Sequence, residues 1–193
     1  MDLSNDALSR LNRRLKDCFL DDPTLRPFAD EDYFWSGQGF RGQLSIRAGA
    51  CFNLPEEHLI EIALFTELLH NASLVHDDIV DSDHERRGHQ TVWHKYGLSK
   101  ALLVGDLLIA KAFEIASSSA IDSSIKSKWT LNLSNAISVA VRGALCELDF
   151  KVAKTDNLFS RYLNMAYDKT GVMFTLPISC VGQTACLSDA EIK

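Results

Sequence analysis

The sequence predicts an all-α protein, and three observations support that prediction. Its 193 residues include only four prolines and ten glycines, so few positions interrupt a helix. Apolar residues recur every three or four positions, which is the period of one helix face. No stretch shows the apolar–polar alternation between turns that predicts strands. Its length corresponds to one domain, over residues 1–193. The hydrophobic fraction of 46% is enough for a sizeable core.

The helices are expected in the following order. The first covers about residues 5–19 and ends near Pro23, because the residue before a proline disfavours helical geometry. The second begins at Pro55, with Glu56 and Glu57 in its first turn, and continues to the aspartates near residue 80. Others are expected over residues 91–96, 99–117, 124–154 and 158–181, with a Ser- and Asp-rich loop over 117–124. Ser188 and Glu191 have the spacing of a capping box, which predicts that a further helix begins there.

The most informative segment lies at the end of the second helix, where Asp77-Asp78-Ile79-Val80-Asp81 is followed by Arg86-Arg87-Gly88. Asp77 and Asp81 are four residues apart and therefore project from the same helix face. Oxygen-only ligands of this kind suit Mg²⁺, which binds one or two carboxylates together with substrate phosphates. Arginines can bind the same phosphates in a bidentate manner. The segment therefore predicts a site for a metal-complexed diphosphate.

The alternative interpretation is a solvated run of charges at a helix end, which is what most such runs are. Residues 72–76 argue against it, because this largely apolar stretch leads directly into the aspartates. The cluster thus ends an apolar helix and does not sit in a polar loop.

Composition excludes some classes of function. A formal charge of −6 and the absence of a basic stripe argue against nucleic acid as a partner. The five scattered cysteines contain no Cys-x-x-Cys pair, which is typical of reduced thiols in a cytoplasmic protein. Residues 1–6 lack the features of a signal peptide, and the apolar stretch 101–113 is interrupted by Asp106 and Lys111. We therefore expect a cytoplasmic protein without a transmembrane segment.

The segment from Glu67 to Asp81, followed by Arg86-Arg87-Gly88, resembles the trans-isoprenyl diphosphate synthases of the polyprenyl synthetase family. The agreement extends over about residues 34–182. It includes Thr91-Val92, Tyr96-Gly97, Leu103-Val104-Gly105-Asp106, Gly143 with Glu147, and Lys169-Thr170. The resemblance implies an isoprenoid-synthase-type helical bundle around a central cavity. It also implies a Mg²⁺-dependent prenyltransferase that condenses an allylic diphosphate with isopentenyl diphosphate, and a homodimer.

The resemblance also assigns roles by position. Asp77 and Asp81 would be direct Mg²⁺ ligands, with Asp78 supporting them. Arg86 would contact the allylic diphosphate, and Lys169 with Thr170 would hold that leaving group. Isopentenyl diphosphate would be bound by Arg41, His70 and Arg87. Taken from the residues alone, Lys169 could equally be a surface lysine, and His70 a satisfied core histidine.

The chain departs from the family at two places. Where the family has Gly-Lys-Arg-x-Arg-Pro, this chain has Gly37-Gln38-Gly39-Phe40-Arg41-Gly42, so two cations for the second diphosphate are missing. Nothing after Gly182 supplies the second aspartate motif, so the C-terminal helices that carry it are expected to be absent from this sequence.

These departures leave two alternatives open. One is a diverged terpene cyclase or prenyltransferase that does not use isopentenyl diphosphate, and the other is a non-catalytic partner subunit of a full-length synthase. Small residues at Ala72 and Ser73, five and four positions before Asp77, favour a product of twenty carbons or more.

Overall fold

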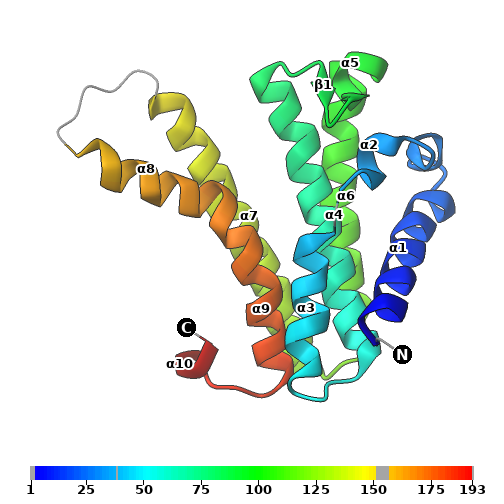
Figure 1. Ribbon diagram of the computed structural model, residues 1–193, viewed down its shortest axis with the longest axis vertical. Helices are drawn as coiled ribbons and strands as arrows, with labels where there is room; N and C mark the ends of the chain where they lie inside the picture. The colour runs from blue at the N-terminus through cyan, green and yellow to red at the C-terminus, as the bar shows by residue number, and fades with distance from the viewer. Residues whose placement is uncertain (1–2, 38, 151–156, 193) are drawn as a thin grey trace.

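The structure, a computed structural model, describes residues 3–37, 39–150 and 157–192. It is an all-helical bundle, as the sequence predicts (Figure 1). Its helices are α1 (Leu3–Asp21), α2 (Asp32–Trp35), α3 (Phe40–Ala50), α4 (Glu56–Asp81), α5 (Val92–Tyr96), α6 (Leu98–Ser118), α7 (Ser123–Phe150), α8 (Leu158–Ala166), α9 (Val172–Thr184) and α10 (Asp189–Ile192). A 3₁₀ turn covers Arg26–Phe28, and one π-helical turn, Tyr167–Gly171, joins α8 to α9.

Helix α4 is the centre of the bundle. It contacts α1, α3, α6 and α9, and every residue from 59 to 69 is buried. A helix that is buried on all sides over this length must be surrounded by other elements, and the stretch rich in apolar residues after Pro55 is the sequence feature that predicts it. The predicted start at Pro55 and the end at Asp81 are both confirmed.

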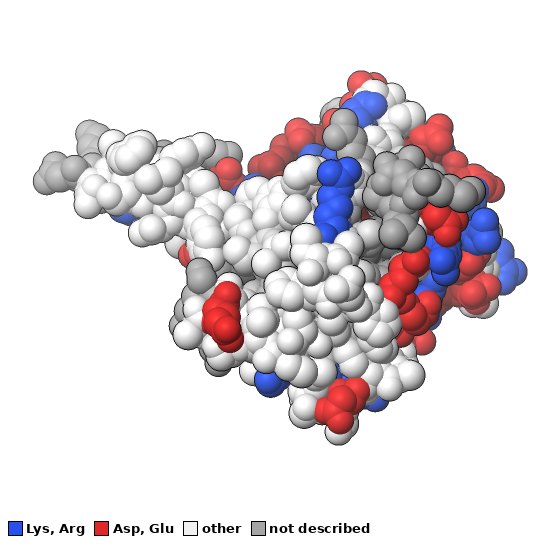
Figure 2. All heavy atoms as spheres, turned by 60° about the horizontal axis from the view of Figure 1, so that its bottom comes forward, with Lys and Arg blue, Asp and Glu red and all other residues white. Residues whose placement is uncertain are grey.

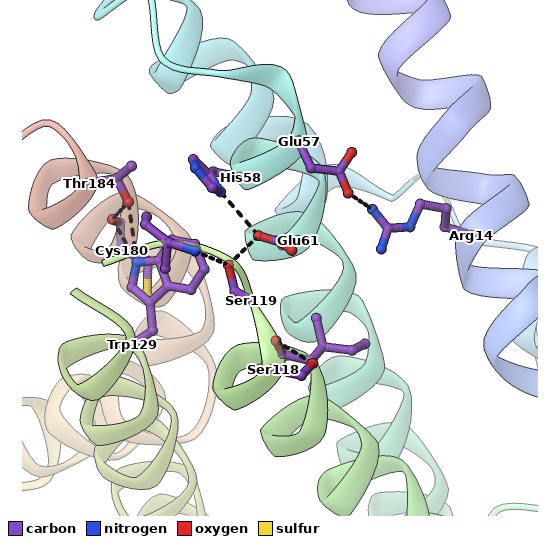
Figure 3. Close-up of polar contacts among 11 residues, drawn as sticks. Arg14, Glu57, His58, Glu61, Ser118, Ser119, Trp129, Cys180 and Thr184 are labelled. Carbon is purple, nitrogen blue, oxygen red and sulfur yellow. Dashed lines mark hydrogen bonds and ion pairs between the residues drawn. The ribbon is translucent and has the colours of Figure 1, made fainter. Parts of the chain in front are cut away.

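Buried polar contacts fix one end of the bundle, the end shown in Figure 3. The buried carboxylate of Glu61 on α4 accepts a hydrogen bond from Ser119 Oγ at 2.7 Å and lies 3.2 Å from His58 Nδ1. The indole Nε1 of Trp129 on α7 donates to the backbone oxygen of Cys180 on α9, 3.3 Å away. These contacts join α4, the loop after α6, α7 and α9, so the bundle is held together at the end opposite to Asp77.

At the other end, α7 and α8 diverge from α4 and α6 (Figure 1). The α8 arm carries few charged side chains, whereas acidic and basic side chains gather on the side of the molecule that carries α1 (Figure 2). Leu158, Phe159 and Leu163 of α8 are among its exposed apolar residues. In the part of the chain that the structure describes, no helix has both the length and the apolar character needed to cross a bilayer.

Two expectations about local structure need correction. No strands were expected, yet Glu85–Arg86 and His89–Gln90 pair as a short antiparallel hairpin. Strands of two residues are too short to show an alternating pattern. The turn between them, Arg87-Gly88, has φ values of +54° and +81°, as a two-residue hairpin turn of type I′ requires.

The second correction concerns the helix expected over residues 158–181. Its chain path is helical throughout, but the π turn at Tyr167–Gly171 adds one residue and shifts the faces on either side. The helix expected over 124–154 is observed as α7 to Phe150, and its last four residues lie outside the described part of the chain. The capping box is confirmed, because the carboxylate of Glu191 accepts hydrogen bonds from Ser188 N at 2.9 Å and Ser188 Oγ at 2.6 Å.

Candidate functional site

The candidate site lies where the end of α4 faces the π turn between α8 and α9. Lys169 Nζ is 3.0 Å from Asp77 Oδ1 on α4 and 2.5 Å from Glu147 Oε2 on α7. Burial opposes the charge on this lysine, but the two carboxylates outweigh that effect and raise its pKa. Lys169 therefore remains a cation and links three elements that are distant in the sequence.

Gly143 on α7 explains how the π turn at Tyr167–Gly171 can pack so close to α7. A Cβ atom at Gly143 would lie 2.7 Å from the carbonyl carbon of Asp168 and closer still to the backbone nitrogen of Lys169. Only a residue without a side chain fits against this backbone. Gly143 and Glu147 are one helical turn apart, so the first admits the π turn and the second binds the lysine that it carries.

The buried Asp78 forms a separate ion pair with the partly exposed Arg86. The Asp78 side chain is 1% exposed, its Oδ2 accepts a hydrogen bond from Tyr33 Oη at 2.6 Å, and its Oδ1 lies 2.6 Å from both Nε and Nη2 of Arg86. Burial opposes the charge of Arg86, but Asp78 outweighs it and raises the pKa of the guanidinium. Both oxygens of Asp78 are thus engaged within the protein, and the pair anchors the hairpin to α4.

Two cavities adjoin the end of α4. The inner cavity, about 340 Å³, lies between α4, α7 and α9 and is lined by Asp77, Lys169, Thr170 and a mostly apolar wall. The outer cavity, about 960 Å³, lies between α1, α3 and α4 and includes Arg87. Arg41 and His70 line both cavities, so they stand on the wall that the cavities share.

Arg41 is held on this wall by neutral and aromatic partners. Its Nη1 lies 2.9 Å from His70 Nε2, and its guanidinium carbon lies 4.4 Å from the centre of the Phe174 ring. Because arginine can only donate, Nε2 of His70 is the acceptor and the ring proton resides on Nδ1. The buried Glu67 accepts a hydrogen bond from the backbone nitrogen of Gly42 at 2.7 Å, close to the same arginine.

The expected site residues are only partly brought together. Asp77, Lys169, Thr170 and Ser73 line the inner cavity, and Arg41, His70 and Arg87 line the outer one. Asp81 is exposed at the last position of α4, and neither Asp78 nor Arg86 is among the residues that line these two cavities. Ala72 is fully buried in the core and does not line the inner cavity, because the next residue along a helix points about 100° away. Gln38 lies outside the described residues.

The chemistry of Asp77 and Asp81 fits Mg²⁺. Among the described residues, no three His, Cys, Asp or Glu side chains converge as a metal site. A magnesium ion does not need such a set, because it binds one or two carboxylates and completes its shell with phosphate oxygens and water. Asp77 and Asp81, one turn apart at the end of α4, are the residues that would hold it.

Several partners in this site carry no clear signal in the sequence. Tyr33 binds Asp78 across 45 residues of chain, and Phe174 stacks on Arg41 across 133. Glu67 precedes the acidic cluster by ten residues, inside an apolar run. The position of each of these side chains depends on tertiary packing. Of the partners in this site, only Glu147 was indicated by the sequence, through its spacing from Gly143.

His70 leads to a prediction about stability and pH. Burial first, and then Arg41, Arg87 and Arg86, lower the pKa of His70 to about 3. An unfolded histidine, with a pKa near 6.5, takes up a proton below that pH that the folded His70 refuses, so stability should fall as the pH drops from about 6.5 towards 3. Between pH 7.0 and 5.5, His70 should contribute a loss of about 1 kcal/mol.

The measurement is urea denaturation of the protein and of His70→Gln at both pH values. Glutamine retains an acceptor for Arg41 but does not titrate, so the variant should lose about 1 kcal/mol less on acidification. An equal loss of stability in both proteins would contradict the inference that folded His70 stays neutral over this pH range.

Comparison with known proteins places this chain in a family. The polyprenyl synthetase profile matches residues 25–193, and the chain belongs to that family. It is 32% identical over 190 residues to a short chain isoprenyl diphosphate synthase of Methanocaldococcus jannaschii, covering 96% of this chain and 55% of that protein. It is 30% identical over 182 residues to a (2E,6E)-farnesyl diphosphate synthase of Mycobacterium tuberculosis, covering 89% and 49%.

Solved structures agree on the isoprenoid synthase fold. A geranylgeranyl pyrophosphate synthetase from Geoglobus acetivorans superposes with a TM-score of 0.88 at 25% identity, over 98% of this chain and 62% of that one. A geranyltranstransferase from Thermotoga maritima gives 0.83 at 24% identity, over 98% and 71%. The chain spans about half the length of the curated relatives it matches. Those relatives are named for different products, so membership of the family does not define a chain length.

Proposed function

We propose that this chain carries the allylic diphosphate site of a Mg²⁺-dependent prenyltransferase. The observation that supports this most is the ion pair of Asp77 and Lys169 in the lining of a mostly apolar inner cavity. A diphosphate has its negative charge at one end and its prenyl tail at the other. A cation beside carboxylates that suit Mg²⁺, with an apolar cavity behind them, matches both ends.

The residues of the site would divide the work in the following way. Lys169, held by Glu147, would donate to the diphosphate oxygens as negative charge grows on the leaving group. Thr170 lines the cavity beside it and would donate a hydroxyl hydrogen bond. Mg²⁺ bound through Asp77 and Asp81 would supply Lewis acidity to the same oxygens. The apolar wall would hold the prenyl tail through burial of apolar surface.

The experiment that tests the proposal measures release of diphosphate from geranyl diphosphate, with and without isopentenyl diphosphate. Release that requires Mg²⁺ and yields a longer prenyl diphosphate only with isopentenyl diphosphate would identify a synthase. Release without Mg²⁺ dependence, or none under any condition, would contradict the proposal.

A second candidate is a prenyltransferase or cyclase that does not use isopentenyl diphosphate, and the geometry at Gly39 favours it. Among the described residues other than its chain neighbours, nothing lies within 4 Å of the position that a Cβ atom of Gly39 would take, so the space that a longer side chain would use at this position is open. In the same geranyl diphosphate experiment, this candidate predicts products that are independent of isopentenyl diphosphate.

The wall of the inner cavity gives a prediction about product length. Ser73 lines the inner cavity one turn before Asp77, so Ser73→Phe should block the path of the growing tail and shorten the product by at least one isoprene unit. Ala72→Phe is the matched control: its ring would be forced into the packed core and should destabilise the protein by about 1–3 kcal/mol. Chromatography of the products would measure the change, and unchanged chain length in Ser73→Phe would refute the role of this wall.

We also infer that the protein is a homodimer, as the family resemblance implies. Leu98, Leu102 and Leu103 of α6 form an exposed apolar surface, which supports burial against a second copy. Light scattering should give twice the chain mass of 21.5 kDa. A monomer mass at micromolar concentration would contradict this inference.

A further inference from the structure

The outer cavity has two arginines whose guanidinium groups are not neutralised within the described protein. Among the described residues, neither Arg41 nor Arg87 forms an ion pair with a carboxylate, and the buried Nε of Arg41 has no hydrogen-bond partner. Burial lowers the pKa of the Arg41 guanidinium; the carboxyl group of Glu67 opposes this effect, and the charge of Arg87 adds to it. Two nearby cations of this kind are suited to an anion with several oxygens, such as a diphosphate.

Arg87 reaches the outer cavity from the turn of the hairpin. Its φ of +54° is uncommon for a residue with a side chain. A Cβ atom at Gly37 would lie 2.7 Å from Nη1 of Arg87, so the guanidinium lies directly against the backbone of Gly37, which also lines the cavity. The position of this cation therefore depends on how the hairpin is held against the α2 segment, residues 32–37.

The residue before Arg87 holds the hairpin in place. Nε and Nη2 of Arg86 each lie 2.6 Å from Oδ1 of Asp78, and Oδ2 of the same carboxylate accepts a hydrogen bond from Tyr33 Oη at 2.6 Å. The Asp78 side chain is 1% exposed, which strengthens these contacts because little water competes for them. The α2 segment therefore meets the hairpin twice, once through Tyr33 and the Asp78 carboxylate, and once through the backbone of Gly37.

We propose that Tyr33 and Asp78 are positioning residues for Arg87. By fixing Arg86, they fix the next residue of the hairpin, and the Arg87 guanidinium stays near that of Arg41, where a diphosphate-bearing ligand can bind both. Neither Tyr33 nor Asp78 is among the residues that line the outer cavity, so they act on this ligand through the hairpin. The inference goes beyond the proposed function, because it concerns the outer cavity and holds with or without an allylic diphosphate in the inner one.

Equilibrium binding of inorganic diphosphate in EDTA tests the inference. Without Mg²⁺, the lysine of the inner cavity is shared by two carboxylates, which disfavour a diphosphate there, so titration calorimetry in EDTA measures binding at the outer cavity. Arg87→Gln should weaken this binding at least about ten-fold, because a charge-assisted contact is lost. Tyr33→Phe should weaken it about three- to ten-fold, because Arg87 is retained but is held less firmly. No binding by the unchanged protein, or full affinity in either variant, would overturn the proposal.

A double variant separates positioning from a general structural effect. If Tyr33 acts through Arg87, Tyr33→Phe should change diphosphate affinity by less than about two-fold in the Arg87→Gln background. A residue that merely keeps the cavity in shape would weaken binding equally in both backgrounds. Equal weakening would therefore contradict the proposal.

Arg86→Lys provides a second way to loosen the same link. Lysine keeps the positive charge but lacks the planar pair of donors that contacts Asp78, so this variant should also weaken binding about three- to ten-fold. It keeps the proposal testable should Tyr33→Phe fold poorly. Full affinity of a folded Arg86→Lys protein would show that the link does not position Arg87.

Glu31→Gln is the matched control. Glu31 directly precedes α2, and its two carboxylate oxygens each accept a hydrogen bond from Lys95 Nζ at 2.8 Å, while Tyr96 Oη donates to one of them. The change loosens the α2 segment from α5 without altering the link through Asp78, and it should change diphosphate affinity less than about two-fold, because exposed ion pairs contribute little. A loss as large as that in Tyr33→Phe would show that any loosening of the α2 segment is enough, and would overturn the specific role of Tyr33.

Discussion

Asp77→Asn should reduce Mg²⁺-dependent release of diphosphate from geranyl diphosphate by about a thousand-fold or more. The carboxylate has two roles: it would bind the metal that neutralises the leaving group, and it holds Lys169 at 3.0 Å. An amide keeps the shape of the side chain but removes the charge that both roles require. Metal stabilisation of a developing negative charge contributes several kcal/mol, and each 1.4 kcal/mol is a factor of ten in rate.

The control for this prediction is Asp83→Asn. Asp83 lies just beyond α4, half exposed, and its only described ion pair is a contact of 3.8 Å with Arg86. Its removal should change the rate less than about three-fold, because isolated exposed pairs contribute little. Equal rates for Asp77→Asn and the unchanged protein would exclude Asp77 from the site.

Gly143→Ala should both destabilise the protein and lower its activity, against the usual trend for glycine in a helix. In an exposed helix, replacing glycine by alanine stabilises by about 1 kcal/mol. Here the new methyl group would meet the backbone of Asp168 and Lys169, which cannot rotate out of the way as a side chain can. Overpacking of this kind typically costs about 1–3 kcal/mol, so we expect net destabilisation.

The loss of activity should be larger than the loss of stability suggests. A shift of the π turn by about 1 Å would draw Lys169 away from Asp77, and misplacement on that scale can reduce rates roughly a hundred-fold. Ser138→Ala, an exposed change on the same helix, is the control and should leave both properties nearly unchanged. Urea denaturation and the rate of diphosphate release should be measured for both variants. A Gly143→Ala protein that is more stable and fully active would show that the backbone of the π turn does not exclude a methyl group at this position.

The sequence predicts the long helices well because their signals are local. Helix α4 is indicated by Pro55, by the acids that follow and by a stretch rich in apolar residues, and the structure begins and ends it at the expected places. The capping box at Ser188 is likewise local and is observed. By contrast, a π turn inserts a single residue without a characteristic composition, so one helix was expected where Tyr167–Gly171 interrupts the period.

The site was predictable as a set of residues but not as an arrangement. The spacing of Asp77 and Asp81, and the family resemblance for Lys169, identified side chains that the structure places at one end of α4. The sequence could not show that Asp78 and Arg86 bind each other, since that depends on Tyr33 from a distant helix. Nor could it show which of Ala72 and Ser73 faces the inner cavity, since that depends on how α4 packs against its neighbours.

The central claim is that the end of α4 and the π turn together bind an allylic diphosphate through Mg²⁺. The most direct test is titration calorimetry with geranyl thiolodiphosphate, an analogue that resists ionisation, in Mg²⁺ and in EDTA. We predict binding in Mg²⁺ that weakens at least about a hundred-fold in EDTA and is lost in Asp77→Asn. Equal affinity in Mg²⁺ and EDTA, or undiminished binding by Asp77→Asn, would contradict the account.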